Sequence, residues 1–430
     1  MIRLAEHEWA AVNAPVFQRL RWIKQLAMTN LVYPGAVHTR FEHSIGTRHV
    51  AGRLCERLGL EPEECEIVCA AALLHDVGHG PFSHVSEQVI DELAGVHGVH
   101  EAVSAWLIRN DKDIRAALGG ELAEAAAALV ALEGPRSAAR DIVSGPTDAD
   151  KLDYLLRDSY FAGVKYGEYD LGRIIDSARI IGPNDASSQL GFDADGLWAV
   201  EGLLMARHHM HRQVYGHKTR IATDIMTTRA LRLGIVEEVL DPAAYRVATK
   251  DRKPAVDEDF IRGYVQQTDA LVLHRLCGAP EGPVRDLAER LRDRRLLRQT
   301  ELLRLNERRQ DLGAPRFAEL IDADETGPAV IADMEEQIAK EIGVPAHLVA
   351  IYVDARTNPT FRNPDAQIRP KDVMIQRGDQ PPQLLQYESE VFRQEILGED
   401  QVWVHLYTPD LEEPDRDRAR KELWSTLSGQ

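Results

Sequence analysis

Histidine and aspartate residues at four places in the chain have the types and spacing of a metal site. His75 and Asp76 stand side by side after a strongly apolar stretch, His43 lies upstream, and Asp150 lies downstream. Imidazole and carboxylate ligands suit Fe, Mn, Zn or Ni, and they leave coordination positions open for water and substrate. The four residues therefore predict metal-assisted hydrolysis.

The distribution of histidine supports a shared site. The chain has 16 histidines, of which eight lie between His38 and His100 and four between His208 and His217. Structural histidines could fall anywhere along a chain, so clustering beside acidic residues indicates a common function. A single member such as His49 is better interpreted as an ordinary helix residue.

Further polar residues flank the predicted metal ligands. Arg40 lies just before the first metal-site histidine and could pair with a phosphate. His79 and His84 follow through a Gly-Pro turn, which could fold them back toward the metal. His100 begins a predicted helix and is a candidate general acid, and a nearby carboxylate could fix its tautomer.

Two predicted helices carry polar stripes at a spacing of three or four residues, which places each stripe on one face. The stripes are Asp150, Tyr154 and Asp158, with Lys151 beside them, and Arg207, His211, Tyr215 and Lys218. A solvated helix face is the usual interpretation of such charge. Beside the metal motif, a wall that binds a polyphosphate and a stacked base is favoured.

Composition limits the class of protein. The 430 residues are 44% hydrophobic and 28% charged, with a net charge of −18. This charge argues against a polynucleotide substrate and says little about a nucleotide, because local Arg, Lys and metal charge outweighs a distant field. No apolar stretch approaches the roughly 18 residues that span a bilayer, and the first residues lack a signal-peptide core. The four cysteines indicate reduced core thiols, so we expect a cytoplasmic protein.

The pattern of apolar residues predicts a mainly α fold, with a helical core and a smaller α+β lobe at the C-terminus. We expect a catalytic core over residues 1–240, a helical extension over 241–343 with oligomer contacts, and the α+β lobe over 344–430. Turn signals predict a hairpin between Ile180 and Val200, and a long helix is expected from Glu201 to Leu240. The pattern also predicts a loop over Pro242–Asp257, helices over Phe260–Arg309, and strands over Leu348–Val353 and Gln401–Tyr407.

Several motifs in one order resemble the HD-superfamily deoxynucleoside triphosphate triphosphohydrolases. The matching stretches are Phe17–Leu26, Pro34–Ala36, Arg40–Gly46, His75–His84, Asp148–Asp158 and Arg207–Lys218. The match is dense over roughly the first half of the chain. The resemblance implies a helical HD fold and hydrolysis of a deoxynucleoside triphosphate (dNTP) to the deoxynucleoside and intact triphosphate.

The resemblance also implies residue roles. The metal ligands would be His43, His75, Asp76 and Asp150. Arg40, His79, His84 and His100 would surround the α-phosphate. Lys151, Tyr154, Arg207 and Lys218 would hold the phosphates. Gln25, Leu26, Asp158 and Tyr215 would read sugar and base, with His211 and His217 lining the same pocket. A Mg ion would bridge phosphate oxygens, and a homo-oligomer, dimer or tetramer, is expected.

The chain departs from the family pattern at two places. Glu87 stands where the family often has Asp, and it is the expected carboxylate partner of His100. Family members that are activated by a regulatory nucleotide carry an Asp-Pro-x-His-Gly stretch near the N-terminus, which this sequence lacks; Asn13 stands where an Asp would be expected.

The predicted helix from Pro283 to Arg309 carries nine arginines and five acidic residues. Such a helix could bind nucleic acid or an effector nucleotide. A solvated helix with ion pairs four residues apart, or an oligomer contact, is favoured.

Other functions stay open at this point. Another hydrolase of the same fold, such as a nucleoside monophosphatase or a cyclic-nucleotide phosphodiesterase, would need fewer cations than a triphosphate requires. A nucleotide-sensing or nucleic-acid-binding protein would use the site mainly for binding. Metal-dependent turnover separates these classes.

Overall fold

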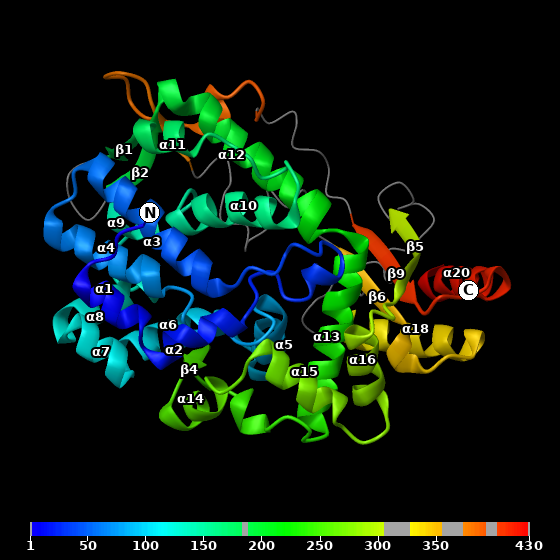
Figure 1. The fold of residues 1–430 in the computed structure, drawn as a ribbon. Coiled ribbons are helices and arrows are strands. Elements are labelled where there is room, and N and C mark those ends of the chain that lie inside the picture. Colours follow the sequence, from blue (N-terminus) through cyan, green and yellow to red (C-terminus); the bar gives the residue numbers. More distant parts are fainter. Residues whose placement is uncertain (1, 183–187, 305–326, 355–372, 393–401, 429–430) are drawn as a thin grey trace.

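A computed structural model describes residues 2–182, 188–304, 327–354, 373–392 and 402–428 (Figure 1). The helices are α1 (Glu6–Val12), α2 (Pro15–Gln18), α3 (Arg40–Leu58), α4 (Pro62–Leu74), α5 (His84–Ala94), α6 (Val99–Asn110), α7 (Lys112–Leu118), α8 (Gly120–Val130), α9 (Ala138–Ser144), α10 (Ala149–Ala162), α11 (Leu171–Ser177), α12 (Leu197–Met210), α13 (Lys218–Val236), α14 (Glu258–Tyr264), α15 (Asp269–Cys277), α16 (Pro283–Arg292), α18 (Gly327–Ile342), α19 (Leu385–Glu388) and α20 (Glu413–Ser428). The strands are β1 (Ala178–Ile181), β2 (Gln189–Asp193), β3 (Ala248–Lys250), β4 (Lys253–Ala255), β5 (Arg298–Arg304), β6 (Ala350–Asp354), β7 (Met374–Gln376), β8 (Gln383–Leu384) and β9 (Trp403–Thr408). The mainly α fold with a C-terminal α+β region is confirmed.

Helices α3 and α4 form a hairpin at the centre of the core. The Thr39 side chain and Glu42 close a capping box at the start of α3. The helix ends at Gly59, whose φ of 65° is a left-handed conformation that glycine adopts readily. Pro62 then starts α4, which ends immediately before His75. Because the two helices run in opposite directions, the start of α3 lies beside the end of α4, and this open end of the hairpin carries the predicted metal ligands.

The segment after α12 departs from the predicted continuous helix over 201–240. Residues His211–Tyr215 form a π-helix, and α13 starts afresh at Lys218 with the His217 side chain as its N-cap. The predicted stripe from Arg207 to Lys218 therefore does not follow one regular helix face. A π-helical turn has a wider repeat than 3.6 residues, which shifts later side chains around the axis.

The hairpin predicted between 180 and 200 is confirmed by the antiparallel pair β1–β2. Strand β7 adds to it in parallel, and β8 completes the order β1-β2-β7-β8. Residues 373–392 thus belong with the catalytic core, since Val373, Ile375 and Phe392 are buried in its apolar cluster. The predicted loop over 242–257 contains the short hairpin β3–β4.

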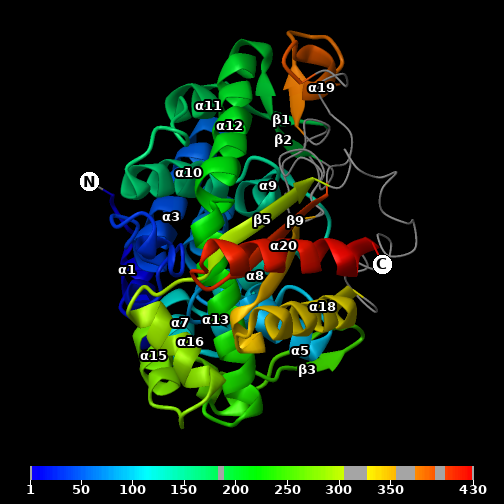
Figure 2. The same ribbon diagram turned by 90° about the vertical axis from the view of Figure 1, so that its right-hand side faces the viewer.

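The C-terminal lobe is an antiparallel sheet in the order β5-β9-β6, beside helices α18 and α20 (Figure 2). Successive side chains of a strand point to opposite faces. In β9, Val404 and Leu406 join the small core beneath α18 and α20, whereas Tyr407 joins the main core. The lobe is therefore packed on both faces, one of them toward the catalytic core.

The prediction of helix over 260–309 was wrong for residues 293–304, and its last five residues lie outside the described part of the chain. Helix α16 ends at Arg292, and residues 298–304 form β5, which pairs with β9 about a hundred residues later in the sequence. Pairing over such a distance leaves no local signal, and the strand places Leu303 in the small core. Arginines of α16 pair with acids on their own helix, as in Arg285–Glu289 and Arg290–Asp286, which supports the interpretation as a solvated face.

None of the described helices is both long enough and apolar enough to cross a membrane.

Candidate active site

The four predicted metal ligands lie together at the open end of the α3–α4 hairpin. His43 Nε2 is 2.9 Å from Asp150 Oδ1 and 3.5 Å from Asp76 Oδ2. His75 Nε2 is 3.4 Å from Asp76 Oδ1 and 3.7 Å from Asp150 Oδ1. Helix α10, which packs on α3, supplies Asp150. Two imidazole nitrogens and two carboxylates thus converge on one point.

The tautomers of both histidines fit a metal site. His75 Nδ1 lies 2.8 Å from the Ala72 carbonyl oxygen, which can only accept, so this nitrogen carries the proton. Its Nε2 is then the lone-pair nitrogen, and it is buried without a hydrogen-bond partner. His43 Nδ1 donates to Asp153 Oδ2 at 2.9 Å, which likewise leaves Nε2 toward the ligand set. Hydrogen bonds of this kind fix metal-binding histidines in other proteins.

Asp153, which the sequence prediction did not include, is held in place by Arg157. The Arg157 guanidinium donates to both of its oxygens, at 2.7 and 2.8 Å. Gly46 of α3 lies against this pair: a Cβ there would be 1.9 Å from Asp153 Oδ1. The i, i+3 spacing of Asp153 from Asp150 on α10 was the available signal, since it places both carboxylates toward α3.

The histidines and carboxylates of the predicted ligand set stabilise one another's charged forms. Burial disfavours protonation of His43, but hydrogen bonds to Asp150 and Asp153 outweigh it and raise the pKa of His43 to about 10. For Asp76, burial opposes ionisation, yet Arg40 and His75 hold the pKa well below its usual range. Burial also opposes ionisation of Asp150, yet the adjacent His43 and His75 rings hold its pKa well below the usual range. The carboxylates are therefore ionised and available as ligands.

Three further histidines stand beside the four predicted metal ligands. The His79 and His100 rings stack with centroids 4.0 Å apart, and the His84 ring stands edge-on to His79 at 5.0 Å. His79 Nε2 lies 3.2 Å from Asp76 Oδ1, which joins this group to the metal ligands. Burial and the nearby Arg40 charge lower the pKa of His79 well below its usual value, so its ring is neutral.

Glu87 links the other two histidines. One of its oxygens bonds His100 Nδ1, and the other lies 3.1 Å from His84 Nδ1. Burial opposes protonation of His100, but Glu101 and Glu87 raise its pKa to about 10. Burial of Glu87 is likewise outweighed by His100, and its pKa lies well below the usual range. The glutamate side chain thus makes both contacts at the position where an aspartate is typical of the resembling family.

Arg40 is oriented toward the same space. Its Nη1 donates to Asp76 Oδ2 at 2.5 Å and its Nε to Ser83 Oγ at 2.9 Å. Its Nη2 is buried with no hydrogen-bond partner. A buried guanidinium N–H without a partner costs free energy, and an anionic ligand would satisfy it.

The loop that carries His79 and His84 is fastened to distant elements through its backbone. The buried Arg19 donates to the carbonyls of Val77 and His79, and the Tyr264 hydroxyl donates to the Gly78 carbonyl. Asp269 at the start of α15 accepts from the backbone N–H groups of Phe82 and Lys24. The contacts of Arg19 span about 60 residues of sequence and those of Tyr264 and Asp269 more than 180, and none of them was predicted.

The loop also contains strained backbone. Phe82 and Ser83 have φ values of 60° and 54°, a region that non-glycine residues rarely adopt. Such a conformation persists where surrounding contacts over-determine it, and it is frequent at functional sites. Here the contact from Asp269 to the Phe82 N–H and the hydrogen bond from Ser83 Oγ to the Lys24 carbonyl hold the turn.

Helix α10 also carries the predicted wall beside the metal ligands. The Tyr154 ring centroid is 6.5 Å from that of His43, and the Tyr154 hydroxyl accepts from Arg207 Nη1 at 2.5 Å. One turn later, Asp158 accepts from the Tyr215 hydroxyl at 2.6 Å. The other Asp158 oxygen is 2.7 Å from Nε2 of His38, a buried residue that the prediction did not assign to the site.

The remaining predicted substrate residues lie in varied places. Gln25 is buried, and its Oε1 has no hydrogen-bond partner. The neighbouring Leu26 is also buried. The Lys151 ammonium is buried and lies 2.5 Å from Asp148 Oδ2. His211 meets the Tyr215 ring edge-on.

The last two residues of the predicted stripe lie beyond the π-helix. His217 caps α13 through its Nδ1, which accepts from the Thr219 N–H. Lys218 is exposed at the start of α13. The structure thus brings Tyr154, Asp158, Arg207 and Tyr215 into direct contact, and it describes no such contact for Lys218.

Comparison with known proteins identifies the helical core. A model of the HD domain matches residues 40–158, and a model of the HD-associated region matches residues 170–251. The chain is 39% identical over 243 residues to an uncharacterized protein of Methanocaldococcus jannaschii, which covers 56% of this chain and 49% of that protein. It is 32% identical over 256 residues to the deoxynucleoside triphosphate triphosphohydrolase SAMHD1 homolog of Dictyostelium discoideum, covering 54% of this chain and 48% of that one.

The chain spans about half the length of the curated relatives it matches. A solved phosphohydrolase from Bacteroides thetaiotaomicron matches nearly all of it: the TM-score is 0.71 and the identity 25%, over 94% of this chain and 95% of the other. The HD-domain match, over residues 40–158, includes all four residues of the ligand set. The chain therefore carries an HD domain followed by an HD-associated region, and it is similar over nearly its whole length to a solved phosphohydrolase.

Proposed function

We propose that the protein hydrolyses dNTPs to the deoxynucleoside and inorganic triphosphate. One observation carries the proposal. Helix α10 presents Asp150 to the metal ligands, and on its next two turns Tyr154 and Asp158 meet Arg207 and Tyr215. A metal-binding group and a wall with cationic and aromatic groups thus share one helix face, as a nucleoside triphosphate requires. The name of the Dictyostelium relative supports the same substrate class.

His43, His75, Asp76 and Asp150 would hold a divalent ion such as Fe, Mn, Zn or Ni. The ligand set fits this role, because the buried His75 Nε2 has no hydrogen-bond partner and both carboxylates are ionised. When bound, such an ion polarises a phosphoryl oxygen and lowers the pKa of water to about 7.

In the proposed reaction, the oxygen of water bonds to the α-phosphorus and the bond from phosphorus to the 5′-oxygen of the sugar breaks. The departing 5′-oxygen needs a proton. His84 suits the role of donor, since its side chain is 69% exposed and Glu87 orients it. His100, predicted as the general acid, has a pKa of about 10 and its side chain is only 17% exposed. We assign it the role of a fixed positive charge.

Phosphate binding would fall to cations around this centre. The unpartnered Nη2 of Arg40 would donate to the α-phosphate beside neutral His79. Arg207, Tyr154, Lys151 and Lys218 would hold the remaining phosphates, with Mg bridging their oxygens. Lys151 would have to leave Asp148 for this role, and Lys218 would have to turn inward.

The nucleoside would lie along the outer part of the wall. Gln25, Leu26, Asp158 and Tyr215 would contact sugar and base, beside His211 and His217. A 2′-hydroxyl would crowd Leu26 and Tyr215, which favours deoxynucleotides. We further propose a cytoplasmic homo-oligomer, with residues 1–240 as the catalytic core, 241–343 as the extension and 344–430 as the C-terminal lobe, except that β5 and α18 pack with the lobe and residues 373–392 pack on the core.

Product analysis tests this function. The protein would be incubated with each dNTP, with GTP and with ATP, in Mn or Mg, beside the variants His75→Ala and Asp76→Ala. We expect deoxynucleoside and intact triphosphate, absent from both variants. Monophosphate or free phosphate as product would favour another HD phosphohydrolase activity. Tight dNTP binding without turnover, alone or in mixtures, would favour the nucleotide-sensing function.

A further inference from the structure

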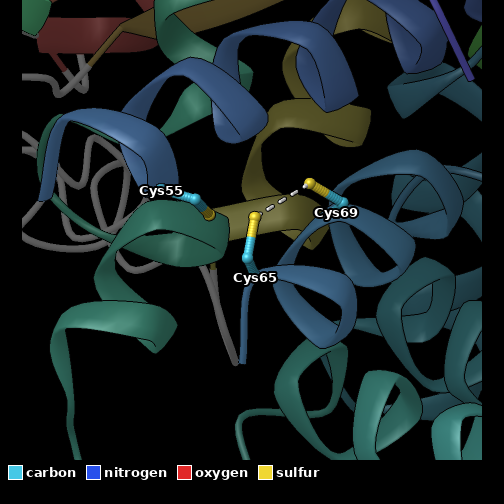
Figure 3. Close-up of side chains that lie close together, drawn as sticks. All are labelled: Cys55, Cys65 and Cys69. Atoms are coloured by element: carbon cyan, nitrogen blue, oxygen red, sulfur yellow. Dashed lines mark hydrogen bonds between the residues drawn. The ribbon is translucent and has the colours of Figure 1, made fainter. Parts of the chain in front are cut away.

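Three cysteine side chains meet at the closed end of the α3–α4 hairpin, opposite the catalytic site. Cys55 lies near the end of α3, and Cys65 and Cys69 lie one turn apart on α4 (Figure 3). The Cys65 and Cys69 sulfurs are 4.0 Å apart, and all three sulfurs lie within 4.8 Å of one another. In the described part of the chain, the other groups of side chains that could bind a metal all contain residues of the candidate active site.

We propose that these three sulfurs form a second metal site, for a soft thiophilic ion such as Cu(I) or Zn(II). Thiolate is the ligand that selects these ions. Three sulfurs at about 2.3 Å from a central ion lie about 4 Å apart in a trigonal arrangement. The spacing in the hairpin is close to this value without any movement of the helices. Cys65, which is partly exposed, would provide the path of entry.

The surroundings favour thiolate at Cys69, whereas the hydrogen bond with Cys69 raises the pKa of Cys55 and burial raises that of Cys65. The Arg48 guanidinium and the Cys69 sulfur meet over Gly52, where a Cβ would lie 3.3 Å from Arg48 Nη1 and 3.6 Å from Cys69 Sγ. Glu8 holds Arg48 there, through Nε at 2.7 Å. A hydrogen bond from Cys55, against the effect of burial, and the Arg48 charge lower the pKa of Cys69. Metal binding would release the thiol protons, and Arg48 would offset the excess negative charge.

The second site is independent of catalysis. Cys55 is twelve residues from His43 along α3, and Cys69, the nearer of the two α4 cysteines, is six from His75. At 1.5 Å per residue these separations are about 18 and 9 Å. An ion bound here would not contact substrate; it would join the two helices beside their connecting turn and stabilise the hairpin that carries the catalytic ligands.

Optical titration tests the proposal with the full-length reduced protein. Cu(I) or Cd(II) is added, and the ultraviolet charge-transfer absorbance between thiolate and metal is followed; imidazole and carboxylate ligands produce no such band. We expect saturation at one equivalent and a raised Tm. The band should persist in His75→Ala and in Cys277→Ser, which removes a cysteine outside the cluster. Affinity should fall at least tenfold in Cys65→Ser and in Cys69→Ser.

Thiol alkylation of the wild-type protein is a second measurement that does not depend on whether the variants fold. Bound Cu(I) or Cd(II) should protect three of the four cysteines from reagent. Absence of a charge-transfer band in the reduced protein, or equal alkylation with and without metal, would overturn the proposal. So would a band that is unchanged in Cys65→Ser and Cys69→Ser. A disulfide within the cluster, together with no band after reduction, would replace the metal site by a redox pair.

Discussion

The two sides of the candidate active site are held in different ways. The loop from His75 to His84 is fixed through its backbone by Arg19, Tyr264 and Asp269, which come from distant parts of the chain. The opposite wall consists of side chains that bond one another, as in Tyr215–Asp158, next to a π-helical turn. The fold therefore positions the proposed reacting groups, whereas the proposed substrate wall consists of side-chain contacts that a bound nucleotide could rearrange.

The largest effect is expected from Asp76→Ala, which lies on the loop that the fold holds through its backbone. The substitution removes a predicted metal ligand and leaves Arg40 without its buried partner. Turnover should be lost and the metal content of the purified protein should fall. His209→Ala, at an exposed position on α12, is the matched control and should behave as wild type. Normal turnover by Asp76→Ala would contradict the assignment of the metal site.

Glu87→Gln should lower kcat by about 10²- to 10⁴-fold, since it disturbs the orientation of His84 and the charge of His100. Steady-state kinetics measures this effect. Glu101→Gln, on the partly exposed side of His100, is the control and should have a smaller effect. Equal losses in the two variants would argue against a special role for Glu87.

Glu87→Gln should also change how the stability of the protein depends on pH. The pKa of His100 is about 10 in the folded protein and about 6.5 in an unfolded chain. A raised folded-state pKa contributes stability that is complete below pH about 6.5 and is lost as the pH rises through 10. Glu87→Gln should weaken this dependence. Denaturant unfolding at a series of pH values would measure it, and an unchanged profile would contradict the coupling.

Asp269→Ala tests whether the backbone anchors of the loop matter for chemistry. It removes the acceptor of the Phe82 and Lys24 N–H groups. A displacement of about 1 Å at the reacting groups can cost about 10²-fold in rate. We expect kcat to fall by up to this factor with little change in KM. A rise in KM alone would show that the loop acts in binding instead.

Asp153→Asn should weaken metal affinity by about 10- to 100-fold, the usual effect of removing the carboxylate behind a metal-binding histidine. Metal titration with an activity readout measures this effect, and kcat at saturating metal should recover toward the wild-type value. Recovery of kcat would distinguish a positioning residue from a ligand. Failure to recover at any metal concentration would contradict that role.

The smallest effect is expected from a substitution in the proposed substrate wall, where side chains bond one another. Tyr215→Phe removes one hydrogen bond to the ionisable Asp158, and such bonds are worth about 1.5–3 kcal/mol. We expect KM for dNTPs to rise roughly tenfold at an unchanged kcat. Steady-state kinetics on a dNTP and the matching ribonucleotide would also show a loss of discrimination. A large fall in kcat would place Tyr215 among the groups that act on the reacting atoms.

The sequence was sufficient for the parts of the site that local spacing determines. His75 and Asp76 are neighbours, and Asp150 and Tyr154 are one helical turn apart, so periodicity alone places them together. Asp269 and Arg19 could not be predicted, because they reach the loop across the fold and contact only its backbone. Strand β5 was predicted as helix for the same reason, since its partner β9 lies about a hundred residues away. Arg207 to Lys218 follow helical spacing in the sequence, and only the structure places a π-helix among them.

The anchoring of the catalytic loop has a consequence for how the protein can evolve. Arg19, Tyr264 and Asp269 bind carbonyl and amide groups, which every amino acid possesses except for the missing N–H of proline. The path of the loop therefore depends little on its side chains, except at Gly78, where a Cβ would lie 2.4 Å from the His100 carbonyl oxygen, and at Ser83, whose hydroxyl holds the turn. Mutations within the loop can alter the reacting groups while the frame that presents them persists. New specificity could thus arise on this scaffold through single substitutions, without a compensating change in the anchors.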